Sequence, residues 1–195
     1  MTPAVLEAAA PAAWRHYDAI VDGGHDHATA WRALMTALLE GPLAESREHV
    51  EWLYRENSRV NLWRKPIAGM LELARELATR GARVGVLSNS EGGLEALLGE
   101  IGMRDAFVAV IDSGRVGLEK PDPKIFEHAF AELGGASGDL AIHIGDSWDA
   151  DVIGARGANW RAIWFGRRVV PVRDPDVAIA RDAREVRTAL RGWGI

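Results

Sequence analysis

The pattern of apolar and polar positions divides the chain into a helical first third and a longer part in which strand and helix patterns alternate. Within residues 1–62, apolar side chains recur at helical spacing over 4–22, 27–40 and 43–60, and no convincing strand pattern occurs. From Pro66 onward, short apolar runs alternate with amphipathic helices, which is typical of βαβ units and a parallel sheet. The pattern predicts an all-helical unit over 1–62 and an α/β core over 63–195.

The α/β core contains a readable series of elements. The predicted strands are 83–87, 107–111, 140–144 and 161–165, and the predicted helices are 66–80, 91–101, 123–133, 150–158 and 176–190. With 195 residues and 48% hydrophobic content, the chain can bury one substantial core and a smaller satellite.

Composition narrows the classes of protein. The sequence has no cysteine, which excludes disulfide scaffolds, zinc-thiolate sites and cysteine nucleophiles. No apolar run approaches the ~20 residues of a membrane span, and no secretory signal pattern occurs, so we expect a cytoplasmic protein that does not enter membranes. The net charge of -5 argues against nucleic acid as the main partner.

The segment from Asp139 to Trp160 carries the first candidate chemistry. The apolar run Leu140 to Ile144 ends in Gly145-Asp146, and a helical pattern follows at once. This arrangement places Asp146 at the carboxyl edge of a parallel sheet, where open α/β folds bind ligands. Asp149 and Asp151 follow within one turn, and carboxylates near a helix N-terminus suit a hard cation. Alternatively, these aspartates only cap the helix.

Two further places fall where a strand meets a loop. Ser88-Asn89-Ser90 follows the strand 83–87, so a hydroxyl, an amide and backbone N–H groups face the same sheet edge and suit a phosphoryl or carboxylate oxygen. The alternative is an ordinary helix start capped by Ser90. Lys120 precedes Pro121, which forces an extended backbone on the lysine, so its ammonium is either placed over an anion or simply on the surface.

Together these places resemble a known family. VLSNS at 86–90, EKPDPKIF at 119–126 and IGDSWDADVIGA at 144–155 are similar, in order and spacing, to the second, third and fourth motifs of the haloacid dehalogenase superfamily. The resemblance covers about residues 60–170, and the helical unit resembles the cap of its first structural class. It implies a Rossmann-like parallel sheet.

The resemblance also implies a role for each matching residue. Ser88 would bind the transferring phosphoryl group, with Asn89 beside it, and Lys120 would neutralise its charge. Asp146 would ligate Mg²⁺, and Asp151 would orient either the lysine or the waters of the metal. The acidic pair Asp146 and Asp151 is typical of the phosphatases of this superfamily rather than of its metal-free 2-haloacid dehalogenases, so phosphate monoester hydrolysis is the implied chemistry.

The chain departs from the family pattern at the first motif. Family members open with an apolar strand ending in Asp-x-Asp, whose first Asp is the nucleophile and whose carboxylate also holds the metal. Tyr17-Asp18 and Val21-Asp22 are the nearest matches here, but they lie in a helical pattern. We therefore expect the central first strand to be missing, Mg²⁺ to bind weakly at most, and catalysis to be impaired.

Two classes of function follow. The chain is either a hydrolase of small phosphorylated molecules or a non-catalytic relative that binds an anion or a protein partner through the retained loops and the cap. If the central strand is missing, unpaired backbone would be costly, so we expect direct pairing of 83–87 with 140–144. We also expect a homodimer, because eight tryptophans and an incomplete core imply exposed apolar surface.

Overall fold

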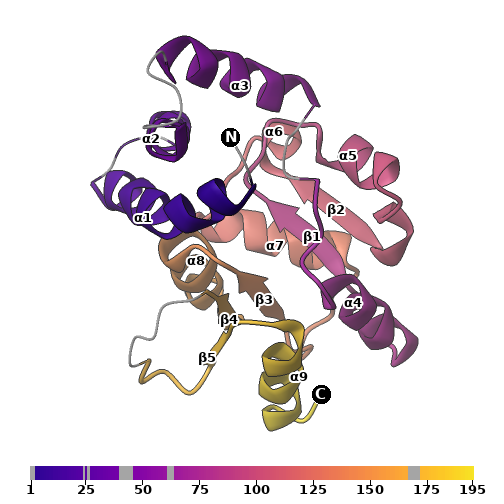
Figure 1. Cartoon of the computed structure of the whole chain (residues 1–195). Coiled ribbons are helices and arrows are strands. Elements are labelled where there is room, and N and C mark those ends of the chain that lie inside the picture. The colour runs from indigo at the N-terminus through magenta and orange to yellow at the C-terminus, as the bar shows by residue number, and fades with distance from the viewer. Residues whose placement is uncertain (1–2, 24, 26, 40–45, 61–63, 167–171) are drawn as a thin grey trace. The chain divides into compact units, whose positions relative to one another are not determined.

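A computed structural model describes residues 3–23, 25, 27–39, 46–60, 64–166 and 172–195. The chain divides into two compact units, Met1–Trp63 and Arg64–Ile195, and each is described here by itself (Figure 1).

The first unit is helical, as the sequence predicts. It contains α1 (Pro3–Asp22), α2 (His27–Leu39) and α3 (Ser46–Val60). Buried apolar side chains from all three helices form its interior: Ala13, Ala30, Trp31, Leu34 and Val50. The Arg32 guanidinium lies 3.7 Å from the centre of the Tyr54 ring and donates to Glu51 at 2.8 Å, which ties α2 to α3. None of the helices in the described part of the chain is long and apolar enough to cross a membrane.

The second unit is an α/β core with parallel strands, which confirms the predicted fold class. Its strands are β1 (Gly85–Ser88), β2 (Ala109–Asp112), β3 (Ile142–Gly145), β4 (Arg161–Phe165) and β5 (Val177–Ala180). Its helices are α4 (Met70–Thr79), α5 (Leu94–Glu100), α6 (Ser113–Val116), α7 (Pro123–Glu132), α8 (Gly154–Gly157) and α9 (Ala183–Gly192), with a 3₁₀ turn η1 (Arg104–Ala106) and a π-helical segment η2 (Trp148–Ile153).

The strands form two separate sheets. β1 pairs with β2, and β4 pairs with both β3 and β5; every pair is parallel. The predicted direct pairing of 83–87 with 140–144 is therefore wrong, because β1 and β3 belong to different sheets. The predicted homodimer concerns a second copy of the chain and stays a prediction.

The hydrogen-bond pattern shows which backbone groups point away from each sheet. Val108 N–H donates to Val84 O and Arg161 N–H donates to Ala141 O. Since backbone groups alternate between the two sides of a strand, Gly85 and Leu87 direct theirs away from β2. Ile142 and Ile144 likewise direct theirs away from β4. Each sheet thus keeps one edge without a strand partner among the described residues.

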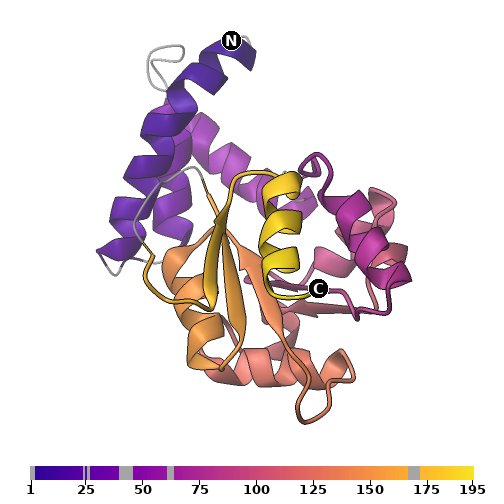
Figure 2. The same ribbon diagram turned by 90° about the horizontal axis from the view of Figure 1, so that it is seen from below.

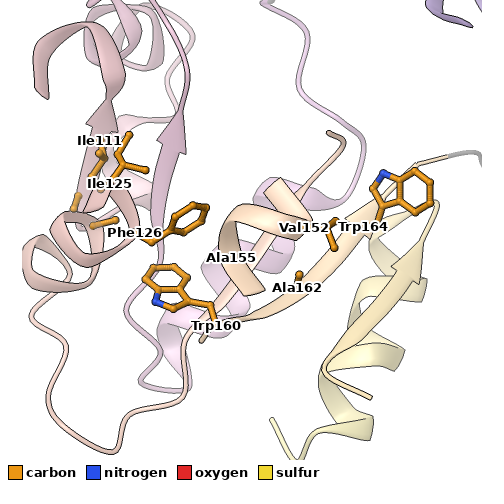
Figure 3. Packing of buried hydrophobic residues seen from close by; sticks show 10 residues of the cluster. Ile111, Ile125, Phe126, Val152, Ala155, Trp160, Ala162 and Trp164 are labelled. Carbon is orange, nitrogen blue, oxygen red and sulfur yellow. The ribbon is translucent and has the colours of Figure 1, made fainter. Parts of the chain in front are cut away.

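One hydrophobic cluster joins the two sheets although their ladders do not (Figure 3). It draws buried residues from β2, α7, η2, α8 and β4: Ala109, Ile111, Ile125, Phe126, Ala129, Val152, Ala155, Trp160, Ala162 and Trp164. A second cluster covers the other face of the β3–β4–β5 sheet with α4 and α9, and Figure 2 shows α9 in yellow beside these strands. Side-chain burial, at roughly 25 cal/mol per Å² of apolar surface, therefore stabilises the interrupted sheet.

The last predicted helix is wrong over its first half. Val177–Ala180 is strand β5, and α9 begins only at Ala183. The side chain of Asp182 accepts the Glu185 N–H at 2.8 Å, which is an N-cap that fixes the start of the helix. The short apolar run before this cap is a buried-strand pattern that helical periodicity had absorbed.

Candidate functional site

The predicted site residues from three separate motifs meet at the carboxyl ends of β1 and β3. Ser88 is the last residue of β1, and Asp146 directly follows β3. Asn89 connects the first motif to the second through two hydrogen bonds with the Lys120 backbone: its Nδ2 donates to Lys120 O and its Oδ1 accepts Lys120 N–H, both at 2.9 Å. The amide of Asn89 therefore positions the lysine.

The Lys120 ammonium is held between the two sheets. Its Nζ lies 2.5 Å from Asp151 Oδ1 and 3.3 Å from Leu87 O, and its side chain is only 9% exposed. Leu87 O points away from β2, so the ammonium lies at the carboxyl end of the open β1 edge. An ammonium has three donors. These two contacts leave the third N–H for a ligand oxygen.

Asp151 is a buried anchor for the lysine. Its Oδ1 receives Lys120 Nζ and lies 2.8 Å from His143 Nε2, and its Oδ2 accepts the Ser147 N–H at 2.8 Å. Burial alone would raise the pKa of this carboxyl, but the His143 hydrogen bond and the Lys120 charge outweigh burial and hold the pKa well below its ordinary value. Of the two roles predicted for Asp151, this geometry favours orienting the lysine.

His143, which the sequence analysis missed, completes this cluster. It lies on β3, is 8% exposed, and packs edge-to-face on Phe126 at 5.4 Å between ring centroids. Burial lowers the pKa of His143, and the nearby Lys120 charge acts in the same direction, against the opposing Asp151 hydrogen bond. A neutral imidazole beside an ionised carboxylate carries its proton on Nε2 and donates it to Asp151. A single histidine inside an apolar strand run was the available sequence signal.

The lowered pKa of His143 predicts an acid-sensitive fold. Below about pH 6.5 the unfolded chain protonates this histidine and the folded chain does not, so the free energy of unfolding should fall by about 1.4 kcal/mol per pH unit from this residue alone. Stability from His143 is therefore complete above that pH. Asp151 acts lower, since stability from a depressed carboxyl pKa is lost only below about pH 3.9.

Urea unfolding of wild type and His143→Gln between pH 7.5 and 5 measures this slope, because glutamine keeps a donor for Asp151 but does not titrate. The variant should have the shallower pH dependence. His128→Gln, on α7, is the control and should keep the wild-type slope. Equal slopes in wild type and His143→Gln would contradict the neutral buried histidine.

Gly145 explains why a glycine precedes Asp146. A Cβ at this position would lie 2.2 Å from Asp151 Cγ and 2.3 Å from its Oδ2. Only glycine leaves room for the carboxylate that holds Lys120. Asp146 itself is exposed at the strand end, and its backbone carbonyl accepts the Trp164 Nε1–H at 3.0 Å.

The donor set for a cation is small. Within the described residues, no group of three or more histidine, aspartate or glutamate side chains converges in a metal-binding arrangement. Asp146 supplies one accessible carboxylate, and Mg²⁺ would need waters and a ligand phosphate to complete its six oxygen ligands. These residues fit a weak magnesium site that depends on the ligand.

Asp112 orders the loop after Ser88 and was also missed. It is 1% exposed and accepts the N–H groups of Gly92, Leu94 and Gly114 at 3.0, 2.9 and 3.1 Å. Helix α5 consequently begins at Leu94 after Gly93, and the reading of Ser90 as an N-cap before Glu91 is wrong. Asp112 pairs in register with Ser88, so β2 supports the loop of the first motif.

The profile of the haloacid dehalogenase-like hydrolases matches residues 4–159, which is most of the chain. The chain belongs to this family. Its clustered Ser88, Lys120 and Asp151 are the side chains of the family motifs identified from the sequence. No match to the chain was found among the curated proteins.

Solved structures share the fold of this family member at low sequence identity. The Bacillus subtilis HAD-hydrolase YfnB, bound to magnesium, has a TM-score of 0.68 and 22% identity, over 97% of this chain and 84% of its own. A HAD phosphatase from Thermococcus onnurineus gives 0.57 and 23%, over 91% and 79%. A 2-haloacid dehalogenase from Pseudomonas syringae gives 0.56 and 20%, over 98% and 93%. These likenesses span a phosphatase and a dehalogenase, so they establish the fold and leave the branch open.

Proposed function

We propose that this haloacid dehalogenase-like chain binds the phosphoryl group of a small phosphate monoester together with Mg²⁺, and that it turns the ester over poorly or not at all. The observation that carries the proposal is the position of Lys120. Its ammonium is buried, fixed by Asp151 and Leu87 O, and keeps one donor for an anion at a sheet edge that also ends in Ser88.

Each retained residue has a binding task. The Ser88 hydroxyl makes only a long contact of 3.4 Å to Asn89 O, so it can donate to a phosphoryl oxygen instead. Lys120 would neutralise charge on the same group, and Asn89 and Asp151 keep the lysine in place. Mg²⁺, when bound, would act as a Lewis acid on the phosphoryl oxygen, and Asp146 is the residue that would hold it. The magnesium in the YfnB structure supports this choice of ion.

The structure also supports the second half of the proposal. Tyr17-Asp18 and Val21-Asp22, the nearest sequence matches to the nucleophile motif, lie in helix α1 and not at the end of a strand. The edges of β1 and β3 that point away from their sheets are open where the family places its nucleophile strand. Without a nucleophilic carboxylate, covalent phosphoryl transfer stops, and the chain functions in binding.

Magnesium and vanadate titration tests the proposed site. Calorimetry should detect Mg²⁺ binding to wild type that strengthens when vanadate, an analogue of the phosphoryl group, is present, because a single carboxylate needs the anion to complete the site. Asp146→Ala should lose this binding. Asp149→Ala removes an exposed carboxylate three residues away and should retain it. Equal binding by Asp146→Ala and wild type would refute the assignment.

A further inference from the structure

Trp148 is unusually exposed for its position. It begins η2 two residues after Asp146 and is 37% exposed, although its helix neighbours Ala150, Asp151 and Val152 are buried. Exposing an indole forfeits the burial of one of the largest apolar side chains. An aromatic surface of this kind beside a ligand site is a candidate contact for the ligand itself.

The Trp148 ring is held in a defined place. It meets the Trp164 ring edge-to-face, with 4.9 Å between centroids and an interplanar angle of 66°. Trp164 is 5% exposed, and its Nε1 donates to Asp146 O at 3.0 Å; Figure 3 shows its indole at the end of β4. This chain of contacts ties the exposed ring to the backbone of Asp146. A ring ordered in advance costs little entropy when a ligand packs on it.

Trp148 also adjoins the charged cluster. Ser147, its neighbour in the chain, donates its N–H to the Asp151 carboxylate that holds Lys120. Consecutive Cα atoms are about 3.8 Å apart, so the indole begins one residue from that hydrogen bond. A ligand whose anionic group contacts Lys120 and whose other end is a ring can reach both features.

We propose that Trp148, supported by Trp164, binds a planar ring in the leaving group of the phosphate monoester, so that the site prefers aryl or heteroaryl phosphates. The inference rests on the proposed phosphoryl-binding function and adds its ligand class. Aromatic pairs gain about 0.5–1.5 kcal/mol beyond the area they bury, which is a factor of roughly two to twelve in affinity. This preference is for a flat ring and not for apolar bulk.

Calorimetric titration with phenyl phosphate, cyclohexyl phosphate and inorganic phosphate, each with Mg²⁺, tests the inference. Phenyl and cyclohexyl phosphate are similar in size but differ in flatness. Wild type should bind phenyl phosphate about fivefold more tightly than cyclohexyl phosphate. Trp148→Leu, which keeps apolar volume without a ring, should reduce this ratio to near one and leave the affinity for inorganic phosphate unchanged. Ile153→Ala removes another exposed apolar side chain of η2 and should keep the wild-type ratio.

The outcomes separate the two proposals. If wild type and Trp148→Leu bind inorganic phosphate equally and show the same ratio of phenyl to cyclohexyl affinity, the ring site is overturned and the phosphoryl site stands. If wild type binds none of the three phosphates, the proposed function fails, and the ring preference fails with it.

Discussion

An extended form of this chain, with an apolar strand ending in Asp-x-Asp added before α1, should hydrolyse p-nitrophenyl phosphate on the order of 10⁴-fold faster than the 195-residue chain, whose turnover should be at background. The reason is the divided sheet. Gly85 and Leu87 on β1, and Ile142 and Ile144 on β3, direct backbone groups away from their own sheets. An added strand that pairs with these groups would end beside Lys120.

The matched control is the same added strand ending in Asn-x-Asn. It should pair equally well and raise the thermal midpoint, because it satisfies the same backbone groups, but it should leave turnover at background. A contrary result is possible in the unextended chain. Magnesium-dependent turnover that is lost in both Ser88→Ala and Asp146→Ala would show that another residue of these 195 is the nucleophile.

The second large effect concerns the buried ion pair. Asp151→Ala should lower the free energy of unfolding by about 3–5 kcal/mol, because it leaves the Lys120 ammonium buried without its counter-charge. Lys120→Met should cost less, since Asp151 keeps the donors from His143 and Ser147. The double variant should cost clearly less than the sum of the two single variants.

Urea unfolding at pH 7 measures this cycle. The control cycle is Arg64 and Glu100, an ion pair with 2.7 Å between Nη2 and Oε2 whose side chains are 39% and 61% exposed. Its coupling should be below about 1 kcal/mol, as for other exposed pairs. Similar couplings in the two cycles would mean that Lys120 and Asp151 do not form the buried anchor described here.

The sequence predicted the parts of the site that depend on strand ends. Ser88 and Asp146 follow apolar runs, and parallel strands bring their carboxyl ends to one edge, so chain order alone indicates that these residues are near one another. The backbone clamp between Asn89 and Lys120 depends on side-chain direction across 31 residues, which no periodicity records.

The errors have physical causes as well. The pairing of 83–87 with 140–144 was expected because unpaired backbone is costly, but the shared cluster around Phe126 and Trp160 and the bridging Lys120 fix the separation of the sheets instead. His143 was overlooked because a lone histidine in an apolar run has no pattern of its own. Its importance comes from Asp151, eight residues away, reaching back to it.

A crystal structure of the chain grown with Mg²⁺ and vanadate tests the central claim most directly. The account predicts vanadate within hydrogen-bonding distance of Lys120 Nζ and Ser88 Oγ, with Mg²⁺ bound between the vanadate and Asp146. Vanadate bound elsewhere, with Lys120 contacting only Asp151 and Leu87 O, would contradict it.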